Sequence, residues 1–135
     1  MKIRSKSSDR GFTLIEMVVV ISLILVLMSI ALPMYNRAIL RSREARLHWD
    51  LSTLNKAIQS YSLDKKKAPQ ALDDLVQAGY IKFIPEDITG RTDTWVTEAE
   101  DQQKAWDPNE PGIGSVHSGS DQTSSEGTVY ASWVK

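Results

Sequence analysis

A long apolar run near the N-terminus, residues 12–34, dominates the pattern of hydrophobic and polar positions. Its one charged residue is Glu16, and beyond that position the polar side chains of the run are Ser22 and Ser29. A helix that lies on a soluble core keeps polar residues along one face, and this run has no such face. About 20 helical residues cross a hydrocarbon core of about 30 Å. The pattern therefore predicts a helix that is long enough to span a membrane.

Beyond the run, apolar residues recur at spacings of three and four, as they do on one face of an amphipathic helix. The periodicity resumes after Pro33, so this proline is expected to kink the helix without ending it. The lysines at 65–67 suit the C-terminal end of a helix dipole, and Pro69 follows them. One helix is therefore predicted, with an apolar half at residues 12–34 and an amphipathic half at 35–67. Its apolar stripe consists of Leu47, Leu51, Leu54, Ile58 and Tyr61.

Residues 68–135 are expected to form a small globular head. Its first part, residues 69–79, predicts a short helix that stops at Gly79. Two acids lie in the first half of that helix, where negative charge favours the helix dipole. An apolar segment at 80–85 is then expected to tie the chain to the core.

The rest of the head is predicted to contain a small antiparallel sheet. Short strands are expected at 113–117 and 128–134, with turn-rich residues before and between them. His117 falls on the first of these strands and is interpreted as structural. The predicted fold class is therefore α+β, with a long N-terminal helix packed on a head that has a short helix and a small sheet. The expected aromatic core of the head consists of Trp95, Trp106, Tyr130 and Trp133.

Composition excludes several functional classes. The 135 residues suffice for one small domain, and the absence of cysteine excludes disulfides, thiolate metal sites and cysteine nucleophiles. With only His48 and His117, the chain cannot form a histidine-rich metal site. No arrangement of serine, histidine and acid suggests catalysis, and no glycine-rich phosphate loop precedes a helix. The chain is therefore not expected to be an enzyme.

Charge is distributed unevenly, although the formal net charge is −1. Residues 1–11 carry four basic residues and one acid, and residues 35–67 carry eight and three. Residues 68–135 reverse this balance, with four basic residues and twelve acids. The arginines at 37–46 could contact phosphate groups of lipids or nucleic acid. Pairing with acids on neighbouring subunits is the favoured interpretation, and no nucleic-acid partner is expected.

Three interpretations of the first 34 residues compete. A secretory signal peptide would end at the small residues Ser-Ile-Ala of positions 29–31, but its apolar part would be long and would begin with an acid. A plain membrane anchor leaves Glu16 as an unpaired acid at the membrane edge, which is unfavourable. The third interpretation accounts for both features.

The third interpretation rests on the motif Gly-Phe-Thr-Leu-Ile-Glu at positions 11–16, which follows a basic leader and begins the apolar run. This motif resembles the prepilin motif of the type IV pilin and type II secretion pseudopilin superfamily. The resemblance implies that residues 1–11 are a leader, that a membrane aspartyl peptidase cuts between Gly11 and Phe12, and that Phe12 is N-methylated. It also implies a type IV pilin-like fold and a helix-kinking proline, which Pro33 matches.

The resemblance gives a role to Glu16 as well. The apolar helices of such subunits pack together in a lipid-free filament core, where an unpaired carboxylate is unfavourable. The implied partner is the N-terminal amine of Phe12, from the same or a neighbouring subunit, and this pair would set the subunit register. A carboxylate that reaches the membrane surface is the alternative.

The head resembles one member of the superfamily in particular. Residues 69–85 are similar to a segment of the major, or family G, pseudopilin of type II secretion, whereas residues 86–95 depart from its usual Asp-Pro-Trp-Gly-like turn. The similarity to family G implies a calcium ion in a C-terminal loop, for which Asp121 and Glu126 are the candidate acids. A solvated loop is the alternative there.

The implied function is that of a structural pseudopilin in a type II secretion filament, which helps to export folded periplasmic proteins across the outer membrane. The implied partners are identical and related pseudopilins, the prepilin peptidase, an inner-membrane assembly platform and a secretion ATPase. The implied location is the bacterial inner membrane, crossed once with the head in the periplasm, before assembly into a periplasm-spanning filament. Two alternatives stay open: a major or minor type IV pilus subunit, and a competence pseudopilin for DNA uptake. The absence of cysteine favours a pseudopilin, because many pilins close a C-terminal loop with a disulfide.

Overall fold

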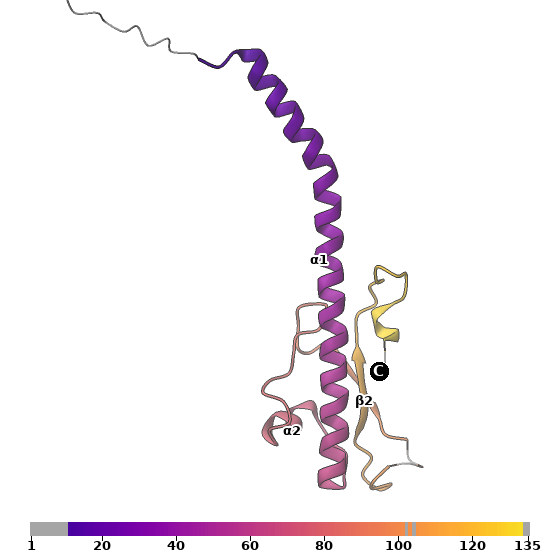
Figure 1. Cartoon of the computed structure of the whole chain (residues 1–135). Coiled ribbons are helices and arrows are strands. Elements are labelled where there is room, and N and C mark those ends of the chain that lie inside the picture. Colours follow the sequence, from indigo (N-terminus) through magenta and orange to yellow (C-terminus); the bar gives the residue numbers. More distant parts are fainter. Residues whose placement is uncertain (1–10, 102, 104, 134–135) are drawn as a thin grey trace, which may run out of the picture. The chain divides into compact units, whose positions relative to one another are not determined.

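The computed structural model describes residues 11–101, 103 and 105–133 (Figure 1). These residues divide into two compact units, with the boundary after Ala38. The fold is α+β, as predicted. Its elements are helix α1 (Leu14–Lys65), helix α2 (Leu72–Gln77), strand β1 (Trp95–Ala99), strand β2 (Ile113–Ser118) and the short 3₁₀ helix η1 (Tyr130–Ser132).

Helix α1 confirms the prediction of one continuous helix through the apolar run and the amphipathic segment. It ends at Lys65, within the predicted lysine cluster, and Lys66 takes a left-handed conformation with φ of 56°. Pro33 lies inside the helix, which continues on both sides of it. Proline lacks the N–H that would bond to the preceding turn, so it weakens the helix locally without ending it here. The kink assigned to Pro33 stays a prediction.

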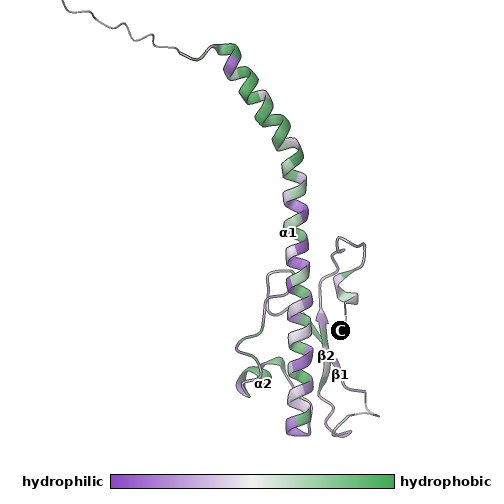
Figure 2. Cartoon of the chain, in the orientation of Figure 1, coloured by the Kyte–Doolittle hydropathy of each residue, from purple (hydrophilic) through white to green (hydrophobic). Residues whose placement is uncertain are grey.

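In the first unit, which ends at Ala38, every described residue is exposed. Figure 2 shows this part of α1 as an almost unbroken hydrophobic stretch. The hydroxyl of Ser22 donates to the carbonyl of Val18, and that of Ser29 to the carbonyl of Val26, each at 2.7 Å. Both hydroxyl groups are bonded within their own helix, so neither leaves an unpaired donor that would make apolar surroundings unfavourable.

The core of the second unit is built on the predicted stripe of α1. All five stripe residues are buried, and Leu54 is fully inaccessible to solvent. In Figure 1, α2 and β2 lie on opposite sides of this part of α1. Burial of a leucine-sized side chain contributes about 1.5–3 kcal/mol, so the stripe organises the head around the helix. The side chains that pack on it from the other elements are Leu75, Trp95, Ile113, Val116 and Tyr130.

Helix α2 ends at Gln77, and the predicted stop residue Gly79 directly follows its C-cap, Ala78. Gly79 has φ of 82°, and its N–H donates to the carbonyl of Val76 at 3.1 Å. The N–H of Tyr80 donates to the carbonyl of Leu75 at 2.9 Å. These two bonds form a Schellman motif, which satisfies the last carbonyl groups of a helix and favours glycine at the left-handed position. At the other end of α2, the carboxylate of Asp74 accepts two backbone N–H bonds, at 2.8 and 3.0 Å.

Strands β1 and β2 form an antiparallel two-stranded sheet. The predicted strand at 113–117 is confirmed as β2, but its partner β1 was not predicted. A register shift between Glu98 and Ala99 interrupts the regular alternation of faces. Because of this shift, Ile113 and Val116 are both buried although they are three positions apart.

Asn55 of α1 binds the backbone of β2 directly. Its Oδ1 accepts the N–H of Val116 at 3.0 Å, and its Nδ2 donates to the carbonyl of Val116 at 3.2 Å. The N–H and C=O of one residue in an antiparallel strand point to the same edge. Since Val116 uses both groups on Asn55, they point away from β1, and a single side-chain amide bonds this edge of β2 to the helix.

The strand predicted at 128–134 is wrong for the residues that the structure describes, and residue 134 lies outside them. Val129 makes an isolated bridge with Thr123, and the chain then enters η1. Gly127, with φ of 83°, turns the chain immediately before this point. The hydroxyl of Ser124 accepts nearby backbone N–H groups, and such local bonds compete with a strand ladder.

One of the four predicted core aromatics is also misplaced. Trp95 and Tyr130 are buried, and Trp133 is half-buried against the core. Trp106 is 44% exposed, so its assignment to the core is wrong. Its ring lies under the ammonium group of Lys66, 4.7 Å from the nitrogen to the ring centroid. An aromatic face attracts a cation, which holds Trp106 near the end of α1 instead.

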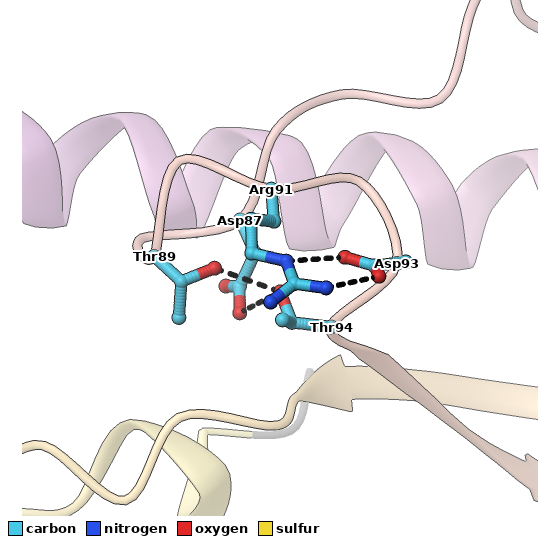
Figure 3. Close-up of polar contacts among 5 residues, drawn as sticks. All are labelled: Asp87, Thr89, Arg91, Asp93 and Thr94. Carbon is cyan, nitrogen blue, oxygen red and sulfur yellow. Dashed lines mark hydrogen bonds and ion pairs between the residues drawn. The ribbon is translucent and has the colours of Figure 1, made fainter.

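The turn before β1 is organised by the buried carboxylate of Asp87 (Figure 3). Its Oδ2 accepts the hydroxyl of Thr94 at 2.9 Å and that of Ser118 at 2.8 Å. Figure 3 also shows the guanidinium of Arg91 paired with the carboxylate of Asp93 in the same turn. The Asp87 carboxylate thereby joins this turn to the end of β2.

Candidate functional site

The predicted processing motif leads into the start of α1. The hydroxyl of Thr13 accepts the N–H of Glu16 at 3.3 Å, and the carbonyl of Thr13 accepts the N–H groups of Glu16 and Met17 at 3.1 and 3.3 Å. Threonine before a helix with glutamate three positions later is the capping-box pattern. The motif therefore starts the helix by its own hydrogen bonds, which leaves Gly11 and Phe12 directly outside the helix.

The other residues of the motif are open to partners. Gly11, Phe12 and Glu16 are exposed, and Phe12 is 75% exposed. A Cβ atom on Gly11 would meet nothing within 4 Å. The chain itself therefore does not require glycine here, and such a requirement would come from a protein that approaches this backbone closely. Residues 1–10 of the predicted leader lie outside the described residues.

The apolar half of α1 is a large uncovered surface. Among the described residues, α1 is the one helix that is long and apolar enough to cross a membrane. None of its most apolar stretch is buried by the chain itself. Removal of apolar surface from water gains about 25 cal/mol per Å², so this surface favours lipid or other helices as its surroundings. Glu16 lies at its N-terminal end, where an acid in lipid would be unfavourable.

Comparison with known proteins identifies the family. Residues 6–32 match the family described as the prokaryotic N-terminal methylation motif. The chain is 33% identical to the type II secretion system core protein G of Escherichia coli (strain K12) over 115 residues, which cover 72% of this chain and 78% of that protein. The chain belongs to the type IV pilin and pseudopilin superfamily.

Fimbrial proteins are similar to this pilin-like chain as well. The type IV major fimbrial protein FimA of Dichelobacter nodosus is 40% identical over 65 residues, which cover 48% of this chain and 41% of FimA. A fimbrial protein of Pseudomonas aeruginosa is 29% identical over 97 residues, 70% of this chain and 63% of that protein. The matched part is thus less than two thirds of the length of these fimbrial relatives. No solved structure gives a significant match.

The basic segment of the pilin-like chain lies on the exposed surface of α1. Arg37, Arg41 and Arg43 are exposed, and the Nε of Arg46 lies 3.5 Å from the Oδ2 of Asp50. The Arg46 side chain is 65% exposed, but that of Asp50 is only 13% exposed, so the gain from this pair is set against the cost of burying the carboxylate. Pairing of the other three arginines with acids of neighbouring subunits stays a prediction.

Glu44 is a buried acid that the sequence analysis did not single out. It is 7% exposed, and its Oε1 accepts the backbone N–H of Ser125 at 2.6 Å and the hydroxyl of Tyr130 at 2.9 Å. Its Oε2 accepts the hydroxyl of Ser125. Glu44 lies three positions before Leu47, on the buried face of the stripe. That position is the signal that could have marked it as an inward-facing acid.

The surroundings of Glu44 shift two pKa values in opposite senses. Burial raises the pKa of Glu44, but hydrogen bonds from Ser125 and Tyr130, together with the charge of Arg41, outweigh burial and lower this pKa below its ordinary value. Burial, the hydrogen bond to Glu44 and the charge of Glu44 raise the pKa of Tyr130 to about 12. At neutral pH, Glu44 is therefore an anionic acceptor and Tyr130 a neutral donor.

The candidate calcium ligands, Asp121 and Glu126, are both exposed. Among the described residues, no three histidine, cysteine or acidic side chains gather in a way that could hold a metal ion. Ser124, which lies between the two acids, accepts the N–H groups of Glu126 and Thr128 with its hydroxyl oxygen. Calcium takes six to eight oxygen ligands, several of them from carboxylates. The donor set of this loop does not fit such a site.

His117 lies half-buried on β2. Its Nδ1 is 2.9 Å from the carbonyl oxygen of Ser118, and its Nε2 is 3.8 Å from a carboxylate oxygen of Glu98 on β1. These contacts link neighbouring positions of the sheet, in keeping with the structural role that was expected of this residue.

Proposed function

We propose that this chain is a structural pseudopilin subunit of a type II secretion filament. The observation that carries the proposal is the similarity to the secretion core protein G, which extends over 78% of that protein, against 41% for FimA. Because the alignment covers 72% of this chain, it includes residues of both the helix and the head. The filament would help to export folded periplasmic proteins across the outer membrane.

In this proposal, the prepilin peptidase cuts the chain between Gly11 and Phe12 and methylates the new amine of Phe12. The start of α1 at Leu14 supports this step, because the bond to be cut lies outside the helix and its backbone is accessible. Gly11 has no side chain to keep the peptidase away. The positive leader would hold this end of the chain on the cytoplasmic side, with the head in the periplasm.

Glu16 would act after the cut. Its carboxylate lies four positions after the new amine of Phe12, at the start of an apolar helix. Once the apolar halves of α1 leave the inner membrane and pack in a filament, Glu16 would need a positive partner in dry surroundings. The amine of Phe12 from the same or a neighbouring subunit is that partner, and the pair would set the register of assembly. Pro33 would let the helix bend as subunits pack. Assembly would need the inner-membrane platform and the secretion ATPase.

A type IV pilus subunit is the second candidate. The observation that favours it is the identity of 40% with FimA over 65 residues, which is higher than the identity with the secretion protein but covers a shorter stretch. The motif and the uncovered helix are compatible with either filament, so an experiment in cells is needed to distinguish the two functions.

The proposal is tested with Glu16→Ala, expressed as the full chain in cells that lack the native copy. Intact mass of the membrane fraction reports the cut and the methyl group, sheared fractions report filaments, and the culture medium reports secretion. We expect a processed chain in the membrane with filaments and secretion lost. Ser22→Ala is the matched control, because Ser22 lies in the same apolar run and its hydroxyl bonds only its own helix.

Each readout has an outcome that contradicts one part of the proposal. Normal filaments from a processed Glu16→Ala chain would contradict the role of Glu16. Loss of surface pili with secretion intact would assign the chain to a pilus. A mature wild-type chain that begins at Leu32 would show a signal peptide and would overturn the cut at Gly11.

A further inference from the structure

The C-terminal segment, residues 119–130, follows β2 and contains little regular structure before η1. Its turn is bonded mostly to itself: Ser124 N–H donates to the carbonyl of Thr128 at 2.7 Å, and Gly127 N–H donates to the carbonyl of Ser124 at 3.0 Å. Such local bonds shape the turn but do not attach it to the rest of the head. The attachment to α1 therefore has to come from other groups.

Glu44 supplies three hydrogen bonds from α1 to this segment. The backbone N–H and the hydroxyl of Ser125 and the hydroxyl of Tyr130 all donate to its carboxylate. The bonded residues are separated by 81 and 86 positions in the chain. Bonds to an ionised acceptor are roughly twice as strong as bonds between neutral groups. The carboxylate is therefore the centre of a cluster of donors, and both of its oxygens are used.

The charge of Glu44 is compatible with its burial because these donors surround it. An ionised carboxylate without partners in the protein interior is strongly unfavourable. On α1 the charge of Arg41 also favours the ionised form of Glu44, and on the segment side the acid Glu126 is exposed beside Ser125. Removal of the donors would leave the buried carboxylate without partners. Removal of the carboxylate would leave the donors without an acceptor, and both losses are unfavourable.

We propose that Glu44 is the anchor of the C-terminal segment, and that its negative charge holds residues 119–130 on α1 without a metal ion. A calcium-bound loop gathers acidic oxygens around a cation. This segment does the reverse, since it presents N–H and O–H donors to an anion on the helix. The proposal concerns the head alone and is independent of which filament the chain serves.

The test is hydrogen exchange of the full chain in detergent micelles, followed by mass spectrometry of its peptides. In Glu44→Ala we expect the protection of the peptide over residues 119–130 to fall by about tenfold or more, because Ser125 N–H loses its acceptor. Glu44→Gln keeps the shape without the charge, so a smaller loss is expected. The peptide over β2 is the internal reference for a folded head, and Glu110→Ala, an exposed acid in another loop, is the control variant.

Calcium and two milder variants complete the experiment. Wild-type protection over 119–130 is expected to be the same with calcium chloride and with a chelator. If Glu44→Ala unfolds the whole head, Ser125→Ala and Tyr130→Phe, which each remove one donor side chain, are expected to loosen the segment alone. Unchanged protection in Glu44→Ala, Glu44→Gln equal to wild type, or protection that depends on calcium would each overturn the proposal.

Discussion

Replacement of Asn55 by alanine is expected to separate β2 from α1. The side chain accepts the N–H of Val116 at 3.0 Å and donates to its carbonyl at 3.2 Å, so Asn55→Ala leaves two partly buried backbone groups without partners. Each orphaned group costs about 1–3 kcal/mol, so the two together cost about 2–6 kcal/mol. In a domain of under 100 residues, a loss of about 2 kcal/mol already lowers the midpoint of thermal unfolding by about 8–16 °C.

The assay is thermal unfolding of the full chain in detergent, followed by near-ultraviolet circular dichroism. This signal reports the aromatic side chains, which lie mainly in the head, and is insensitive to the helical content of α1. Gln59→Ala is the control, because Gln59 is exposed one turn further along the same helix. An Asn55→Ala chain that unfolds within about 2 °C of Gln59→Ala would refute the reasoning, because two orphaned groups cannot cost so little.

Asn55→Asp adds an independent check of the same geometry. At neutral pH one oxygen of its carboxylate accepts the N–H of Val116. The other oxygen, which is also an acceptor, faces the carbonyl oxygen of Val116. When protonated, the acid can donate to that carbonyl and restore both bonds. The deficit of Asn55→Asp relative to wild type at the same pH is therefore expected to shrink as the pH falls. A deficit that is independent of pH would show that Val116 is not its partner.

Two further predictions concern ionisable groups of the head. Burial raises the pKa of Asp50 despite the nearby charge of Arg46, so its ionised form is disfavoured in the folded state and stability is lost as the pH rises through that pKa. Urea unfolding at pH 7 is expected to place Asp50→Asn within about 0.5 kcal/mol of wild type or above it, and a larger loss would mean that the pair with Arg46 stabilises the head. The raised pKa of Tyr130, about 12 against an ordinary 10.0, means that its contribution is complete below pH 10 and is lost as the pH rises towards 12. The pKa of Tyr80 is also raised, so the test is whether absorbance titration of tyrosinate loses a group that ionises near pH 12 in Tyr130→Phe, and identical titration curves would contradict the burial of this hydroxyl.

The elements that depend on local sequence could be predicted. The length of the apolar run, the stripe from Leu47 to Tyr61 and the lysines at its end define α1, because helix periodicity and end signals are read from neighbouring residues. The same holds for α2, where Gly79 supplies the left-handed position of its C-terminal motif. The processing site at Gly11 and Phe12 stays a prediction, and it rests on the family motif because no periodicity contains it.

The features that depend on distant partners could not be predicted. Strand β1 buries only Trp95 and exposes its other four residues, so its sequence lacks the clear alternation of a half-buried strand. Glu44 and Asn55 read as ordinary polar positions of a helix, because their partners lie more than 60 positions away in the chain. Trp106 was assigned to the core on hydrophobicity alone, and the cation beside it could not be foreseen.

The polar bonds between α1 and the rest of the head also have a consequence for the order of folding. They join positions separated by 61, 81 and 86 residues, and contacts of such long range form slowly because large loops must close first. Helix α1 is synthesised first and can form from local bonds alone. The donor Tyr130 is synthesised 86 positions after Glu44, so the Glu44 carboxylate stays hydrated until that residue has left the ribosome. A chain released before that residue would carry a complete membrane helix and an unfinished head, and its open strand edges would be available to neighbouring unfinished chains.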